Sequence, residues 1–313
     1  MACILFYPLA EMTSKRKVNY PPNIIAPHMF KENLLKGKVA IITGGGTGIG
    51  KAMAERFGEL GSKVCILGRR EEVLIKTSEE LRKLGIEVRY HTCDVRSPEE
   101  IREAVDYFYK EFGNIDILVN NAAGNFISPT ENLSPHAIDS VLGIVLHGTL
   151  YMTLELGKRW IESSSGGVVL DIVATYSWTG SAFVVPSAAA KAGVLAAVRS
   201  LAVEWARYGI RHVAIAPGPF PTEATRKNLF PIPEVEKLIA DRVPLGRVGR
   251  LEEISDLAAF LVSENAAYIN GEVITIDGGE WLKGAGQFND LLGLSKENWE
   301  YIRTIAGKPR RKD

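Results

Sequence analysis

Cysteine is scarce in this sequence, with only Cys3, Cys65 and Cys93 among 313 residues. Three cysteines without metal-ligand spacing exclude a disulfide framework and fit a reducing compartment. A net charge is also absent, since 37 Lys and Arg residues balance 37 Asp and Glu residues. No overall field therefore attracts nucleic acid or a membrane surface, and neither is an expected partner. The five histidines are scattered, so no metal site is expected.

Long hydrophobic runs are missing too, because no apolar run reaches the roughly 18 residues that a membrane span requires. Near the N-terminus, the apolar stretch 2–10 precedes the basic cluster 15–17, which reverses the order of a secretory signal. The last residues, 310–313, do not form a peroxisomal address. We therefore expect a protein that is neither secreted nor peroxisomal: cytoplasmic in a prokaryote and mitochondrial in a eukaryote.

Short β-branched runs alternate with longer helical patterns from residue 38 onward. This alternation is typical of an α/β protein with a Rossmann-type, doubly wound parallel sheet. The expected strands, seven in a single sheet, are 39–43, 63–67, 87–92, 115–120, 167–173, 211–216 and 272–276. The expected helices are 49–60, 71–84, 98–112, 135–162, 186–208 and 251–262.

The domain organisation follows from where this pattern begins and ends. Prolines interrupt any regular element in 1–33, which we expect to be an N-terminal tail. A single cofactor-binding domain is expected at 34–291, followed by a C-terminal extension at 292–313. Within the domain, 219–250 breaks the alternation and is expected to form a lid over the substrate.

A glycine-rich turn directly follows the first expected strand, with Gly44, Gly48 and Gly50 in TGxxxGxG spacing. In such a turn, backbone N–H groups and a helix N-terminus face the pyrophosphate of a dinucleotide. The residues predicted to hold it are Thr43, Gly44, Gly46, Thr47, Gly48, Ile49 and Gly50.

Arginines stand where an acidic residue would bind the ribose of NAD. Arg69 and Arg70 follow the second strand, and their planar donors suit a 2′-phosphate that a carboxylate would repel. NADPH is therefore the predicted cofactor. Further predicted cofactor contacts, at the ends of the later strands, are Asp94, Val95, Asn121, Ala122, Pro217, Gly218, Pro219 and Phe220.

These motifs resemble the short-chain dehydrogenase/reductase family over about residues 38–280. The usual proton donor of that family is a tyrosine four residues before a lysine, but here Ser187 stands four residues before Lys191. Two further polar positions of the family are occupied by Ala174 and Val145. Lys191 remains, and the resemblance implies that it holds the nicotinamide ribose.

Longer stretches at 121–131, 180–187 and 286–291 resemble one branch of that family, the 2,4-dienoyl-CoA reductases, notably the mitochondrial type. In that branch a serine is usual at the position of Ser187. A different tyrosine and an asparagine, which match Tyr176 and Asn125, replace the usual tyrosine in catalysis. The resemblance implies NADPH-dependent reduction of a 2,4-dienoyl-CoA to a 3-enoyl-CoA in unsaturated fatty acid β-oxidation. Tyr176 and Asn125 would stabilise the dienolate, with Ser187 and Lys191 completing the catalytic set.

The same resemblance implies that Arg69, Arg96, Phe126 and Ser134 contact the acyl-CoA substrate, and that the protein is a homotetramer. Each of the last three has a structural alternative: a surface charge for Arg96, a core position for Phe126 and a helix N-cap for Ser134. His147 is expected to pack against a neighbouring helix and to take no part in catalysis.

Two other functions stay open. The first is a ketone or 3-oxoacyl thioester reductase, which the missing tyrosine before Lys191 disfavours, because carbonyl reduction needs an acid beside the new alkoxide. The second is an NADPH-binding protein without catalytic activity. The presence of Tyr176, Asn125 and Lys191 disfavours that alternative.

Overall fold

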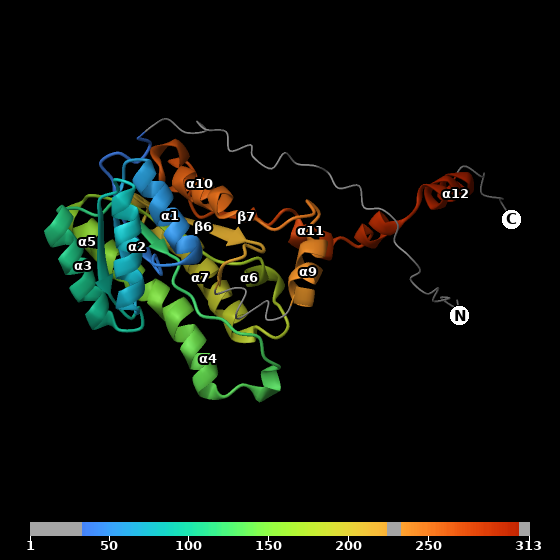
Figure 1. The fold of residues 1–313 in the computed structure, drawn as a ribbon, viewed down its shortest axis with the longest axis horizontal. Helices are drawn as coiled ribbons and strands as arrows, with labels where there is room; N and C mark the ends of the chain where they lie inside the picture. The colour runs from blue at the N-terminus through green and yellow to red at the C-terminus, as the bar shows by residue number, and fades with distance from the viewer. Residues whose placement is uncertain (1–32, 224–232, 307–313) are drawn as a thin grey trace.

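A parallel sheet lies at the centre of the protein, with helices on both of its faces (Figure 1). The structure, a computed structural model, describes residues 33–223 and 233–306. The seven strands follow the order β3-β2-β1-β4-β5-β6-β7, and every neighbouring pair is parallel. The order reverses between β1 and β4, which is the switch point of a doubly wound sheet. The predicted Rossmann-type fold is confirmed.

The strands agree with the predicted ones to within two residues at each end. They are β1 Val39–Thr43, β2 Lys63–Gly68, β3 Val88–Thr92, β4 Ile117–Asn120, β5 Gly167–Ile172, β6 Ile210–Pro217 and β7 Val273–Ile276. Continuous apolar runs form most of them, since a parallel strand covered on both faces has no side that faces water.

The helices of the described residues are α1 Gly48–Glu59, α2 Glu71–Lys83, α3 Pro98–Phe112, α4 Pro135–Leu142, α5 Gly148–Ser163, α6 Tyr176–Thr179, α7 Val185–Glu204, α9 Pro233–Arg242, α10 Leu251–Val262, α11 Glu280–Ala285 and α12 Lys296–Ala306. The helix predicted over 186–208 ends earlier, at Glu204, and a short 3₁₀ turn follows it. Within the predicted lid 219–250, residues 224–232 lie outside the described residues, so the lid stays a prediction. The tail 1–32 and residues 307–313 lie outside them as well.

One predicted helix, 135–162, contains a π-helical turn. Gly143–His147 form this turn between α4 and α5, and such turns are frequent near functional sites. By length and composition alone, the stretch Pro135–Ser163 could cross a membrane, although only 33% of its most apolar window is buried in the molecule. Helices that pack on a protein core pass the same test, and α5 packs on β4 and β5.

The apolar core is divided by the sheet. On one face, α1 and α10 contribute Phe57 and Ile254; on the other, α3 and α5 contribute Phe108 and Trp160. Trp160 has no exposed surface, and its indole N–H donates to the carbonyl of Ile115 at 2.7 Å. This bond joins α5 to the chain just before β4.

We expect Trp160→Ala to lower the free energy of unfolding by about 3–5 kcal/mol, because it removes a buried aromatic side chain and leaves a cavity. The Ile115 carbonyl also loses its donor. Chemical denaturation, followed by circular dichroism, measures the change. Trp299→Ala is the control, because Trp299 on α12 is 41% exposed and should change stability by less than about 1 kcal/mol. Equal effects of the two substitutions would contradict this view of the core.

Candidate active site

The glycine turn between β1 and α1 is shaped for close approach of a ligand. Gly44 and Gly48 have φ values of +66° and +55°, a region that favours glycine. A Cβ on Gly50 would lie 2.4 Å from the carbonyl oxygen of Gly44. At the start of α1 the side chain of Thr47 makes no capping bond, and the first turn contains no acidic residue. Its N–H groups are therefore suited to an anion such as a pyrophosphate.

Two side chains predicted to contact the cofactor, Thr43 and Asn121, also brace this turn. The Thr43 hydroxyl oxygen accepts the N–H groups of Asn121 at 3.0 Å and Ala122 at 2.9 Å. The Asn121 amide donates to the Thr43 carbonyl at 3.0 Å. The segment after β4 is thereby held against the glycine turn, at the switch point of the sheet.

Arg69 and Arg70 are exposed where β2 ends, at the start of α2. After β3, Arg96 forms an ion pair with Asp94, with its Nε 3.0 Å from both carboxylate oxygens and its Nη2 2.5 Å from Oδ2. Arg96 holds the pKa of Asp94 below its usual range, and Arg69 adds a smaller effect. The structure thus joins two residues predicted to contact different molecules. Arg96 is exposed, as the surface-charge alternative predicts, and it is paired with Asp94.

The ends of β6 and β7 close the other side of the site. The N–H of Gly218 donates to the carbonyl of Ile276 at 2.9 Å, and a Cβ on Gly218 would lie 2.6 Å from Cβ of Asp277. Pro219 and Phe220 are buried and line a cavity of about 110 Å³ with Leu245. Val95, after β3, is buried as well, while Gly46 and Ile49 lie within the glycine turn and the start of α1.

Tyr176, Ser187 and Lys191 come together at the carboxyl end of β5. Tyr176 begins α6, and its hydroxyl lies 3.1 Å from the hydroxyl of the buried Ser187 on α7. Ser187 and Lys191 are four residues apart on α7 and therefore share one face of the helix. The Lys191 ammonium donates to the carbonyl of Ile172, the last residue of β5.

Burial controls the protonation of this group. It raises the pKa of the Tyr176 phenol, and the bond to Ser187 lowers that pKa by a smaller amount, so the phenol is a proton donor at neutral pH. Burial also lowers the pKa of Lys191 to about 8, against the attraction of Asp171, which raises it. Lys191 is therefore still mostly an ammonium at pH 7.

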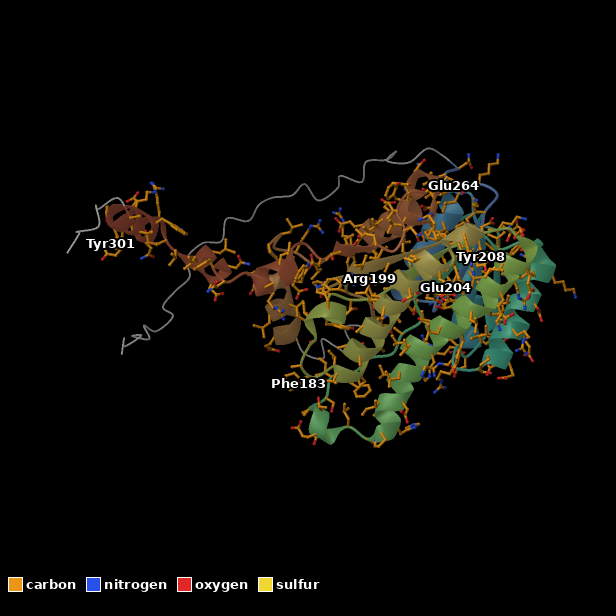
Figure 2. The ribbon with its side chains drawn as sticks, turned by 180° about the vertical axis from the view of Figure 1, so that it is seen from behind. Phe183, Arg199, Glu204, Tyr208, Glu264 and Tyr301 are labelled. Atoms are coloured by element: carbon orange, nitrogen blue, oxygen red, sulfur yellow. The ribbon has the colours of Figure 1, made fainter. Side chains whose placement is uncertain are left out.

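Asn125 lies in the loop after β4, and the described residues hold no hydrogen bond between it and Tyr176. Its amide oxygen accepts the N–H of Phe126 at 2.9 Å, which leaves the amide N–H groups available to a ligand. The N–H of Ser128 donates to the carbonyl of Phe183 at 3.0 Å, so this loop is tied to the segment before α7. In Figure 2, Phe183 lies toward the lower edge of the molecule, beside the green segment that leads into α4.

The structural alternatives have different outcomes. Phe126 is 37% exposed, so the core alternative is wrong. Ser134 caps α4, because its hydroxyl accepts the N–H of Ala137 at 3.2 Å. His147 is exposed, and its ring lies 5.9 Å from that of Tyr151 on the same helical stretch. The prediction that His147 packs against a neighbouring helix is therefore wrong for the single chain.

Three residues were missed. Asp171 in β5 and Asn120 in β4 are buried and joined by a hydrogen bond of 3.0 Å. Their signal was present, since each is a polar residue within an otherwise apolar strand. Phe183 adopts a φ of +65°, which is strained for a side chain of this size, and no sequence signal indicated it.

The comparisons with known proteins identify the family of the chain. Residues 44–280 match a family described as Enoyl-(Acyl carrier protein) reductase. A Bacillus subtilis protein named probable 2,4-dienoyl-CoA reductase [(2E)-enoyl-CoA-producing] is 48% identical over 252 residues, which cover 79% of this chain and 98% of that protein. A Caenorhabditis elegans protein named probable 2,4-dienoyl-CoA reductase 3 [(3E)-enoyl-CoA-producing] is 44% identical and covers 94% and 97%.

Solved structures of dehydrogenases share the fold of this chain. A short chain dehydrogenase from Bacillus anthracis is 46% identical, with a TM-score of 0.72 over 78% of this chain and 97% of that chain. A gluconate 5-dehydrogenase from Burkholderia cenocepacia, in complex with NADP and tartrate, is 30% identical, with a TM-score of 0.75 over 80% and 98%. The chain therefore belongs to the short-chain dehydrogenase/reductase family and groups there with relatives named 2,4-dienoyl-CoA reductases.

Proposed function

We propose that this protein reduces 2,4-dienoyl-CoA thioesters with NADPH, in the breakdown of unsaturated fatty acids. The observation that carries the proposal is the hydrogen bond between Tyr176 and Ser187, with Lys191 one turn further along α7. It places a phenol beside the position where most of the family has its tyrosine. The names of the relatives support the same substrate.

The reaction needs donors at the thioester oxygen. When bound, NADPH supplies a hydride, which adds to C5 of the dienoyl chain and moves negative charge onto that oxygen. We assign the two donors to the Tyr176 hydroxyl and the Asn125 amide, which act as an oxyanion hole does. The buried Ser187 orients the Tyr176 hydroxyl, and Lys191 adds a positive charge to the site.

The position of the second proton decides the product. Protonation of the dienolate at C2 gives a 3-enoyl thioester, and protonation at C4 gives a 2-enoyl thioester. The two relatives carry names for different products. We propose the 3-enoyl product, because donors grouped at the thioester oxygen stand next to C2. Reaction in D₂O, followed by NMR, should place deuterium on C2 and the double bond at C3–C4. A double bond at C2–C3 would contradict this assignment.

NADPH is proposed from the residues at the ends of β1 and β2. The glycine turn fits a pyrophosphate, because no side chain caps the N–H groups at the start of α1 and the first turn has no acidic residue. Arg69 and Arg70 are exposed and uncommitted to any ion pair among the described residues, and they suit a 2′-phosphate. A related solved structure contains NADP.

We expect Gly50→Ala to weaken NADPH binding by about tenfold or more. The new Cβ would meet the Gly44 carbonyl at 2.4 Å, and overpacking of this kind costs about 1–3 kcal/mol, which moves the turn away from the phosphates. Titration of NADPH fluorescence measures the change. Gly284→Ala, on α11, is the matched control, because its Cβ would have no neighbour within 4 Å. Unchanged NADPH binding in Gly50→Ala would show that the pyrophosphate does not bind at this turn.

A homotetramer is proposed from the apolar surface of two long helices. Leu154 on α5 and Val203 on α7 are 45% and 82% exposed in the single chain. Two charged residues labelled in Figure 2, Arg199 and Glu204, are also exposed on α7 and lie near Val203 in the sequence. Exposed apolar helix faces are typical of subunit contacts. Light scattering after gel filtration tests the proposal, and a monomeric mass would contradict it.

A further inference from the structure

A cluster of buried polar side chains lies on the face of the sheet covered by α5, next to the strand end where Tyr176 and Ser187 meet. Asn120 and Asp171 are partners in the register of β4 and β5, and the Asn120 amide donates to the Asp171 carboxylate at 3.0 Å. The same amide donates to the hydroxyl of Thr153 on α5 at 3.0 Å. Asp171 is only 3% exposed. A carboxylate so far from water needs a partner of opposite charge.

Lys191 supplies that charge through space, because the two side chains form no direct hydrogen bond or ion pair among the described residues. It is 6% exposed, and its ammonium donates to the carbonyl of Ile172, the residue next to Asp171 on β5. Asp171 and Lys191 attract each other, and neither is influenced by another ionisable group. From β4 and α5 the cluster receives the uncharged Asn120 and Thr153. On β6, the partner of Asp171 in the register is Ala214, which has no charge.

Burial acts on both groups in the direction that removes charge. It raises the pKa of Asp171 to about 7 and lowers the pKa of Lys191 to about 8, and their mutual attraction opposes both changes. If the carboxylate were removed, the pKa of Lys191 would fall further. The lysine would then lose its proton at a lower pH.

We propose that Asp171 is a positioning residue that keeps Lys191 charged at the end of β5, where the carbonyl of Ile172 holds the ammonium near Tyr176 and Ser187. The cluster gives Lys191 its only opposite charge among the described residues, so the carboxyl group sets the pH range in which the site has its ammonium. The proposal rests on the proposed function only where catalysis is the readout, because the pairing itself is a property of the protein alone.

The first test compares the pH dependence of kcat/KM in the parent and in Asp171→Asn. Asparagine has the same shape and can still accept the bond from Asn120, so the fold has little reason to change. We expect the alkaline limb of the profile to move down by about one pH unit or more, as loss of an opposite charge near a buried group predicts. The acid side at pH 6 should change much less.

Thr153→Val is the matched control. It removes a neutral member of the same buried cluster, so it tests a structural effect without a change of charge. We expect its alkaline limb to coincide with that of the parent. Coincident limbs in the parent and Asp171→Asn, or equal shifts in both variants, would overturn the proposal.

A second measurement does not depend on activity or on the folding of Asp171→Asn. Coupling between two groups is reciprocal, so Lys191 must lower the pKa of Asp171 as much as Asp171 raises that of Lys191. In protein labelled with ¹³C in the aspartate carboxyl groups, NMR titration should show the Asp171 signal titrating at higher pH in Lys191→Met than in the parent. An unchanged titration would overturn the pairing. A shifted titration in a protein that does not reduce dienoyl-CoA would keep the pairing and reject the proposed function.

Discussion

Tyr176→Phe is expected to lower kcat for a 2,4-dienoyl-CoA about a hundredfold, and tenfold at the least. The substitution keeps the ring and removes only the hydroxyl that Ser187 holds at 3.1 Å. Loss of one donor to a developing oxyanion typically costs about 10²–10³ in rate. The interaction strengthens only as charge develops, so KM should change much less than kcat. Steady-state kinetics with NADPH and hexadienoyl-CoA measures both.

The companion variant is Asn125→Ala, for which we expect a loss of at least about tenfold in kcat. If both groups donate to the same oxygen, the double variant should lose less than the product of the two single effects. Tyr268→Phe is the control, since Tyr268 is fully exposed near the amino ends of the strands and should behave as the parent. Full activity in Tyr176→Phe would show that the Tyr176 hydroxyl is not the donor to the thioester oxygen.

Arg69→Ala is expected to raise KM for NADPH by about tenfold to a hundredfold while KM for NADH stays nearly constant. The reason is that a 2′-phosphate is present only in NADPH, and a hydrogen bond to a charged group contributes about 1.5–3 kcal/mol. Arg69 is exposed at the end of β2, so its removal should leave the fold intact. Kinetics with each cofactor in turn measures the preference.

The double variant Arg69→Ala/Arg70→Ala should lose most of the preference for NADPH. Arg102→Ala, an exposed arginine on α3, is the control and should leave both KM values unchanged. The cofactor effect should also weaken as salt is added, because exposed charges are screened. If the arginine variants weakened the binding of NADPH and NADH equally, the two side chains would stabilise the start of α2 and would not bind a phosphate.

Local patterns predicted the sheet well, because each buried parallel strand is an apolar run that needs no knowledge of its neighbours. The glycine turn was equally visible, since Gly44, Gly48 and Gly50 have conformational and steric requirements that only glycine meets. Both features depend on a few consecutive residues. They therefore leave a direct trace in the sequence.

Features made by residues far apart in the sequence were not predicted. The pairing of Asp171 with Asn120 depends on the register between β4 and β5, and its coupling to Lys191 depends on how α7 packs on β6 and α5. The π-helical turn Gly143–His147 lies against α7, so its extra residue reflects packing and not local preference. The pairing of Arg96 with Asp94 is local, but a loop after a strand allows several side-chain directions, and the sequence does not select one.

The central claim is tested most directly by mixing the purified protein with NADPH and hexadienoyl-CoA and following the absorbance of cofactor and diene together. The account predicts that both absorbances fall in equal molar amounts, and that a 3-oxoacyl-CoA of the same length gives little oxidation of NADPH. NADPH binding without loss of the diene, or faster turnover with the 3-oxoacyl-CoA, would contradict the account and leave only the fold and the family.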